Sequence, residues 1–281
     1  MGDLGTDTAV EQIDDNRYSA KLNSDWRIWG PQGGYIASVA LRAAGAASPF
    51  ARPASFSCHF LGVADFDEVE LTVAPLRVAR TACSQRVELT QGGRTMLEAT
   101  VWSVGDVDGL EHDVSEAPDV PGPDGLPTLD ELLANSDDPG PSFSFWNNFV
   151  CKPITFRTDW PPAGPLPPVW QRWHQFAPTA TFDDSWIDAC RSLVLIDVQS
   201  WPSASPQHAY ADHGFIAPSL DLYVAFHDPR PQSAWLLSDG HGPVARDGLM
   251  GWNGRLWSED GALVASGTGQ MLCRRVRTPP S

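Results

Sequence analysis

The same order of elements occurs twice along the chain, and this repeat constrains the fold more than any other feature. Residues 53–61 (PASFSCHFL) and 218–227 (PSLDLYVAFH) both have the composition of a strand. A Val-Ala-Arg tripeptide follows each of them, and then a hairpin signal, Gln91-Gly-Gly in the first half and Glu259-Asp-Gly in the second. A tripeptide match alone is weak. Its agreement with the strand before it and the hairpin after it favours a duplication.

A helix is predicted before the strand in each half. Residues 33–47 place apolar side chains at helical spacing and are rich in small residues, which would let a curved sheet wrap closely around this helix. Residues 183–201 have a similar apolar stripe in the second half. That stripe carries a carboxylate, Asp197.

The composition changes in the middle of the chain, where Pro, Gly and Asp interrupt helices and central strands. We therefore expect an N-terminal domain over residues 1–105, a linker over residues 106–142 and a C-terminal domain over residues 143–281. Within the linker, Thr128 and Glu131 have the spacing of a capping box, which predicts one short helix.

The charge of the chain restricts its partners. Nineteen basic and 35 acidic side chains give a net charge of −16, which disfavours nucleic acid and anionic membranes. A small anion such as coenzyme A needs only a few well-placed donors and stays possible. We expect a cytoplasmic protein, because the amino terminus does not resemble a secretory signal and no run of about 18 apolar residues occurs.

Several kinds of chemistry lack their sequence signatures. The chain has no G-x-S-x-G elbow, no P-loop and no G-x-G-x-x-G at a helix start. Its five cysteines are odd in number and form no C-x-x-C pair, which favours reduced, buried thiols. His208 and His213, with Asp212 between them, lack a third metal ligand. We expect no cofactor and no metal.

Several motifs resemble the acyl-CoA thioesterase II family of double-hotdog enzymes, over nearly the whole chain. They are the WGPQGGY segment from Trp29 to Tyr35, the strand PASFSCHFL, and the series LVLIDV, SLDLYVAFH and GTGQMLCR in the second half. The resemblance implies an α+β double hotdog, with two antiparallel sheets each wrapped around a central helix.

The resemblance also implies a set of catalytic residues. In that family a carboxylate on the second helix, a hydroxyl at the start of the next strand and a Gln on the last strand orient the hydrolytic water. The matching positions are Asp197, Ser219 and Gln270. Ser219 stands where Thr is commoner, and the residues on either side of Gln270, Gly269 and Met271, depart from the family's pattern.

These residue types suit thioester hydrolysis, which needs an activated water and donors for the developing oxyanion. Asp197 lies in an apolar run, where desolvation would raise its pKa and make it a better base. A helix start offers unpaired N–H groups, so Gly33, Gly34 and Tyr35 are candidates for substrate binding. Candidates for contacts with coenzyme A phosphates are Arg77, Arg80, Arg246 and Arg274.

Each assignment has a structural alternative. Asp197 could be a buried carboxylate satisfied by an arginine or by backbone amides. Ser219 could be a turn residue, and Gln270 an ordinary strand residue.

The alternative functions are a hotdog enoyl-CoA hydratase or dehydratase, which needs an Asp and His pair, and an acyl-CoA-binding protein without catalysis. In either case the partner is acyl-CoA, and we expect a homodimer or a higher homo-oligomer.

Overall fold

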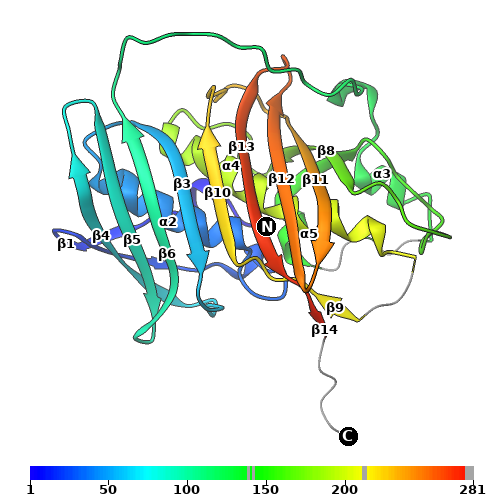
Figure 1. Ribbon diagram of the computed structural model, residues 1–281, viewed down its shortest axis with the longest axis horizontal. Coiled ribbons are helices and arrows are strands. Elements are labelled where there is room, and N and C mark those ends of the chain that lie inside the picture. The colour runs from blue at the N-terminus through cyan, green and yellow to red at the C-terminus, as the bar shows by residue number, and fades with distance from the viewer. Residues whose placement is uncertain (138–139, 141–142, 211–213, 276–281) are drawn as a thin grey trace, which may run out of the picture.

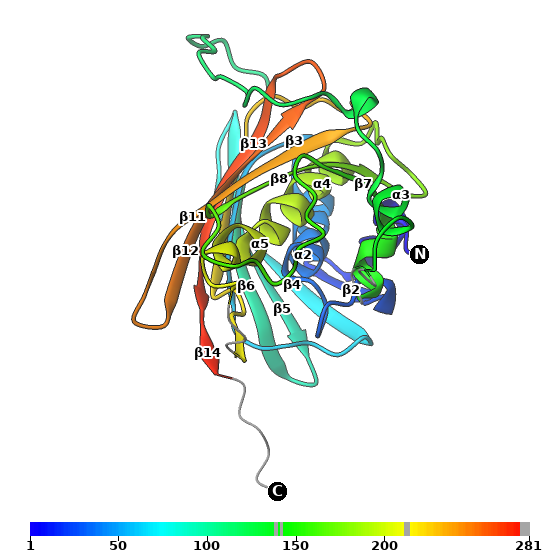
Figure 2. The same cartoon turned by 90° about the vertical axis from the view of Figure 1, so that its right-hand side faces the viewer.

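Two long helices, α2 (Gly33–Ala47) and α4 (Ser185–Val198), pack against one face of a large antiparallel sheet in the computed structural model (Figures 1 and 2). The structure describes the whole chain except residues 138–139, 141–142, 211–213 and 276–281. In this described part the other helices are α1 (Leu4–Asp7), α3 (Leu129–Leu133) and α5 (Ser200–Ala204), with four short 3-10 turns at Ser24–Trp26, Pro123–Gly125, Ser144–Asn148 and Ser205–Gln207.

The strands form one sheet of 12 within the described residues, in the order β1-β2-β4-β5-β6-β3-β10-β13-β12-β11-β8-β7, and a separate pair, β14-β9. Their bounds are β1 (Glu11–Asp14), β2 (Arg17–Lys21), β3 (Arg52–Phe60), β4 (Glu68–Val78), β5 (Ala82–Gln91), β6 (Arg94–Val104), β7 (Phe149–Pro153), β8 (Val169–Phe176), β9 (Phe215–Ile216), β10 (Asp221–Phe226), β11 (Leu236–Arg246), β12 (Leu249–Ser258), β13 (Leu263–Leu272) and β14 (Arg274–Arg275).

The strand order bears out the predicted duplication. From the centre outward the first half reads β3-β6-β5-β4-β2, and the second half reads β10-β13-β12-β11-β8. A helix precedes the central strand in each half. The expectation of two separate sheets is corrected by this order, because β3 and β10 pair with each other, with Ser57 opposite Tyr223. Pairing two edge strands satisfies backbone groups that would otherwise be exposed at each edge.

The local predictions hold with small differences. Residues 33–47 form one helix as expected, whereas the pattern over residues 183–201 is divided between α4 and α5. Both hairpin turns use glycines with positive φ, namely Gly92 and Gly93 in the first and Gly261 in the second. A positive φ costs little free energy only in glycine, because glycine has no Cβ.

The linker has the predicted helix and also covers part of the sheet. Thr128 and Glu131 form both hydrogen bonds of a capping box at the start of α3. Before this helix, the Trp173 indole N–H donates to the carbonyl of Pro121 at 2.9 Å. Trp173 belongs to a buried apolar cluster with Leu237 and Trp257. The linker therefore shields apolar side chains of the second half.

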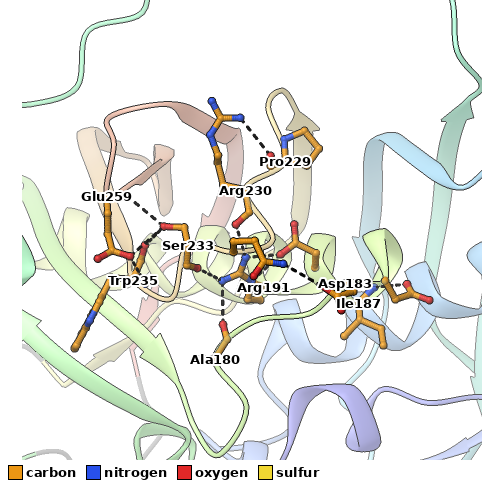
Figure 3. Close-up of polar contacts among 12 residues, drawn as sticks. Ala180, Asp183, Ile187, Arg191, Pro229, Arg230, Ser233, Trp235 and Glu259 are labelled. Atoms are coloured by element: carbon orange, nitrogen blue, oxygen red, sulfur yellow. Dashed lines mark hydrogen bonds and ion pairs between the residues drawn. The ribbon is translucent and has the colours of Figure 1, made fainter.

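Arg191 fixes α4 to the loop between β10 and β11 (Figure 3). Its guanidinium is buried, is paired with Asp188, and donates to the carbonyls of Ala180, Ser233 and Arg230 at 2.7 to 3.1 Å. A buried charge is tolerated only when it is paired and hydrogen-bonded in this way. The anchor sets the position of the helix that carries Asp197.

The two helices approach each other very closely at Gly34. A Cβ at this position would lie 2.4 Å from the carbonyl oxygen of Leu193 and 2.6 Å from the Cα of Val194. Ser38 continues the contact by donating to the Cys190 carbonyl at 3.3 Å. Because the neighbouring atoms at Gly34 are backbone, a side chain there could be accommodated only by separating the helices.

None of the helices in the described ranges is long and apolar enough to span a membrane. All five cysteines are free thiols, and four of them are buried, as the sequence predicts.

We predict that Gly34→Ala lowers the free energy of unfolding by roughly 1–3 kcal/mol, the usual cost of overpacking a tight contact. Urea denaturation followed by tryptophan fluorescence would measure the change. Gly109→Ala is the matched control, because nothing lies within 4 Å of a Cβ at that linker position. Equal midpoints for the two variants would contradict the close helix contact.

Candidate functional site

Asp197 lies in the last turn of α4, where its carboxylate meets the first turn of α2. The residue is 6% exposed. One of its oxygens, Oδ2, accepts hydrogen bonds from the Gln32 side-chain amide at 2.6 Å and from the Gly34 backbone N–H at 3.0 Å. A helix start suits a carboxylate, since its first N–H groups lack helical partners and carry partial positive charge.

Gln32 is a site residue that the sequence did not reveal. It is the N-cap of α2 and 2% exposed. Its Oε1 accepts from the Tyr35 backbone N–H at 2.7 Å, so its Nε2 must be the atom that faces Asp197. Gln is not among the preferred N-cap residues. The sequence signal that could have indicated Gln32 was its place directly before the two glycines at which this helix begins.

Ser219 reaches the same carboxylate from the sheet. It lies two residues before β10, and its hydroxyl donates to Asp197 Oδ1 at 3.3 Å. A β-bridge to Met271 on β13 holds its backbone in place. The structure thus brings Asp197 and Ser219 together, as the family resemblance implies.

The side chain of Gln270 lies elsewhere. Along β13 the side chains alternate, with Gly269 and Met271 buried and Gln270 exposed. Gln270 is paired with Gly251, and its amide lies beside that glycine. Successive residues of a strand point to opposite faces of the sheet, so Gln270 faces away from the helices and from Asp197. A shift by one residue brings only Gly269 or Met271 to the inner face, and neither carries an amide side chain.

The three residues predicted at the start of α2 have different surroundings. Gly33 is partly exposed, and a Cβ there would lie 2.9 Å from Asp197 Oδ2. The Gly34 N–H is occupied by Asp197. Tyr35 is fully buried, stacks on Trp26 and donates its hydroxyl hydrogen to the Asp7 carbonyl. Its side chain therefore holds the N-terminal segment and does not line the site.

Burial raises the pKa of Asp197 to about 6, against the opposing effect of the hydrogen bonds from Gly34 and Ser219. A carboxylate with this pKa is largely ionised at neutral pH and more basic than a solvated one. Burial also raises the pKa of the nearby Cys58 thiol well above its usual range, which disfavours a thiolate nucleophile there. Asp197 is thus the basic group of the site.

A pocket of about 260 Å³ lies further along the sheet, and neither Asp197 nor its hydrogen-bond partners are among its lining residues. Its position follows from strand pairing, because Ser219 is bridged to Met271, Met271 is paired with Met250, and Met250 lines the pocket. Trp201, four residues after Asp197, forms another part of the wall. The remaining lining residues are Ser205, His208, Phe215, Ala245, Arg246, Asp247, Gly248, Leu249 and Cys273.

Within the described residues, the duplicated fold contains one such site. Asp197 and Gly45 lie at equivalent places, each 12 residues after the first residue of its helix. By the same count Trp186 is equivalent to Gly34. Trp186 packs on Gly45 and is 8% exposed. At the place equivalent to the contact between Asp197 and Gly34, the protein therefore has an indole ring against a glycine and no carboxylate.

No cluster of His, Cys, Asp and Glu that could hold a metal ion occurs among the described residues. Asp212 and His213 from the sequence pattern lie outside those residues.

The pKa of Asp197 makes a prediction about stability. Its folded-state pKa of about 6 exceeds its usual value of 3.8, so the folded protein loses stability as pH rises through this window. We expect Asp197→Asn to match the parent near about pH 4 and to exceed it by roughly 2–3 kcal/mol at about pH 8. Urea unfolding at both pH values tests this. A pH-independent difference would contradict the raised pKa.

Solved structures with the same fold include thioesterases and a dehydratase. The acyl-CoA thioesterase II TesB2 from Mycobacterium marinum is 21% identical with a TM-score of 0.79, over 98% of this chain and 99% of that chain. The tesB protein of Mycobacterium avium subsp. paratuberculosis is 22% identical with a TM-score of 0.77, over 97% and 98%. The dehydratase domain of the polyketide PpsC from Mycobacterium tuberculosis is 14% identical with a TM-score of 0.51, over 95% and 97%. At these identities the likeness shows the fold alone.

Matches to family models distinguish between a thioesterase and a dehydratase. The model of the acyl-CoA thioesterase N-terminal domain matches residues 22–104, and the model of the C-terminal domain matches residues 121–272. Together they span most of the chain, including Gln32, Asp197 and Ser219. The chain belongs to the acyl-CoA thioesterase family and is a thioester hydrolase.

Proposed function

We propose that this enzyme hydrolyses acyl-CoA to a free acid and coenzyme A by general-base catalysis, with Asp197 as the base. The observation that carries the proposal is the buried Asp197 carboxylate, held by Gln32, Gly34 and Ser219 and with a pKa raised to about 6. A general base works best when its pKa lies near the operating pH.

The two oxygens of Asp197 have different roles in this proposal. Oδ2 accepts two hydrogen bonds at 2.6 and 3.0 Å, which fix the carboxylate. Oδ1 has one longer hydrogen bond, from Ser219 at 3.3 Å, and so retains lone-pair capacity for a water. That water gives its proton to Oδ1 as it attacks the thioester carbonyl. Ser219 lies close enough to orient the same water.

The Gly33 backbone N–H is the proposed donor to the carbonyl oxygen. Among the first N–H groups of α2, those of Gly34, Tyr35 and Ile36 all have acceptors within the protein. Gly33 is partly exposed and lies directly beside the carboxylate. A preorganised backbone donor at this place would stabilise the oxyanion that forms on attack. The thiolate of coenzyme A then leaves and takes up a proton.

The contacts of Asp197 also bear on the alternative functions. A hydratase or dehydratase of this fold needs a histidine paired with the aspartate. The described hydrogen-bond partners of Asp197 are Gln32, Gly34 and Ser219, without a histidine. These neighbours can hold a water but cannot act as a second acid or base, which favours hydrolysis.

Asp197→Asn is expected to lower kcat/KM by roughly 10³-fold, because the amide cannot accept the proton of the attacking water. The assay is release of free thiol from acyl-CoA substrates. The unfolding measurement described above controls for misfolding, since this variant should be at least as stable as the parent at neutral pH. Full thiol release by Asp197→Asn would rule out the mechanism.

The site in the structure contains Gln32, whereas the family resemblance implied Gln270. We predict that Gln32→Ala lowers kcat by roughly 10²-fold, because the carboxylate loses the donor that positions it. Loss of that donor also raises the pKa of Asp197, so the acidic limb of the pH–rate profile moves to higher pH.

Gln270→Ala is the matched control and should keep kcat within about twofold, as expected for a surface side chain. A large loss in Gln270→Ala together with a small one in Gln32→Ala would instead support the trio of Asp197, Ser219 and Gln270.

A further inference from the structure

Apolar side chains lead from the Asp197 carboxylate toward the surface along β3. Cys58 lies on the inner face of this strand, where burial and then the nearby charge of Asp197 raise the pKa of its thiol. Phe60, two residues later, points to the same face and is only partly buried. Its backbone N–H donates to the carbonyl of Leu220, the residue after Ser219, at 2.9 Å. In Figure 1 this end of β3 lies beside the start of β10. Phe60 is therefore at the edge of the reaction centre.

Two exposed side chains extend this apolar surface. Val63, in the loop after β3, is 61% exposed, and Trp29, in the loop before α2, is 57% exposed. The two loops touch, because a Cβ at Gly30 would lie 2.8 Å from Cγ1 of Val63. Trp29 lies three residues before Gln32, whose side chain donates to Asp197. Both exposed side chains are thus connected to the reaction centre, one through β3 and the other through the start of α2.

The loop that carries Trp29 is a closed turn. Arg27 and Pro31 form an isolated β-bridge, and the Ile28 N–H donates to the Gly30 carbonyl at 2.9 Å. The turn holds the indole of Trp29 outward, where it adds little to the stability of the fold. Exposed apolar side chains that gather in one place mark a binding surface.

The charge of the neighbouring chain indicates which end of the substrate this surface suits. Residues 61–68 include Asp65, Asp67 and Glu68, all exposed, and no Lys or Arg. Arg27, whose guanidinium lies 4.1 Å from the centre of the Phe66 ring, offsets one of these charges. An acidic surrounding repels the phosphate groups of coenzyme A but has no such effect on an uncharged acyl chain.

We propose that the acyl group of the substrate passes over Phe60 and lies against Val63 and Trp29, and that these two side chains set the preference of the enzyme for long apolar acyl groups. The inference rests on the proposed function, which places the thioester carbonyl at Asp197. A CH₂ group that is fully removed from water strengthens binding roughly fourfold. Because this surface covers the chain on one side only, each CH₂ should contribute about twofold.

The test is the ratio of kcat/KM for decanoyl-CoA to kcat/KM for butanoyl-CoA, measured by release of free thiol. The parent should have a ratio well above one. The double variant with Trp29→Ser and Val63→Ser should lower this ratio roughly tenfold, the weight of about two fully covered CH₂ groups. General damage to the site would reduce both values of kcat/KM in proportion, so an unchanged ratio in the double variant would overturn the proposal.

A double variant with Trp102→Ser and Val78→Ser is the matched control. Trp102 is an exposed residue of β6 between the buried Val101 and Ser103, so it points to the face of the sheet away from the helices. Val78 is 63% exposed and ends β4, whereas the loop of Val63 precedes the start of that strand. The control should keep the ratio of the parent.

Binding of non-hydrolysable decanoyl and butanoyl thioethers of coenzyme A gives a second measurement that does not depend on catalysis. In calorimetry, the double variant with Trp29→Ser and Val63→Ser should raise Kd for the decanoyl compound roughly tenfold more than Kd for the butanoyl compound. An equal change in the two Kd values would contradict the proposal. Asp197→Asn should leave this comparison intact, so a failure of the proposed hydrolysis is seen separately, in the thiol assay.

Two other occupants of the surface would give different results, and either result would overturn the proposal. If the surface held the coenzyme A arm, the same double variant would lower kcat/KM for butanoyl-CoA but not for the butanoyl N-acetylcysteamine thioester, which lacks that arm. If a second copy of the chain covered the surface, sedimentation velocity would show that the double variant dissociates and the control does not.

Discussion

The contact between the start of α2 and the end of α4 is the constraint on which the site depends. Gly34 allows the helices to approach until backbone meets backbone, with its Cβ position only 2.4 Å from the Leu193 carbonyl oxygen. This approach buries Asp197 and supplies it with the Gly34 N–H and the Gln32 amide. Without these donors a buried carboxylate would be too costly to keep ionised, and without burial it would be a weak base. One helix packing interaction thus sets both stability and reactivity.

Much of the fold could be predicted from the sequence, because its signals are local. Small residues at helical spacing indicated α2, and glycines in two hairpin signals indicated the turns that the structure contains. The repeat predicted two equivalent halves. Their union in one sheet was not predictable, since nothing in a strand's own sequence shows that β3 will pair with β10. That pairing depends on how the two halves meet, which is a long-range property.

The site was predictable only in part, for a similar reason. Asp197 was marked by its apolar surroundings in the sequence, and Ser219 by its place before a strand. Gln270 was expected from a motif, but the face on which a strand residue lies depends on register, and here Gln270 is on the outer face. Gln32 acts through a contact with a residue far away in the sequence. The equivalent place in the other repeat was not predictable either, because only the packing of the two helices shows that Trp186 lies against Gly45 there.

The pH dependence of kcat/KM tests most directly whether Asp197 is the base. An N-acetylcysteamine thioester is the substrate of choice, because a phosphate with a pKa of about 6 would add its own titration. The raised pKa of Asp197 predicts a plateau above about pH 7 and a tenfold fall per pH unit below about pH 6. This acidic limb should be lost from the residual activity of Asp197→Asn. A limb at the usual aspartate value near about pH 4, or one that persists in this variant, would contradict the assignment.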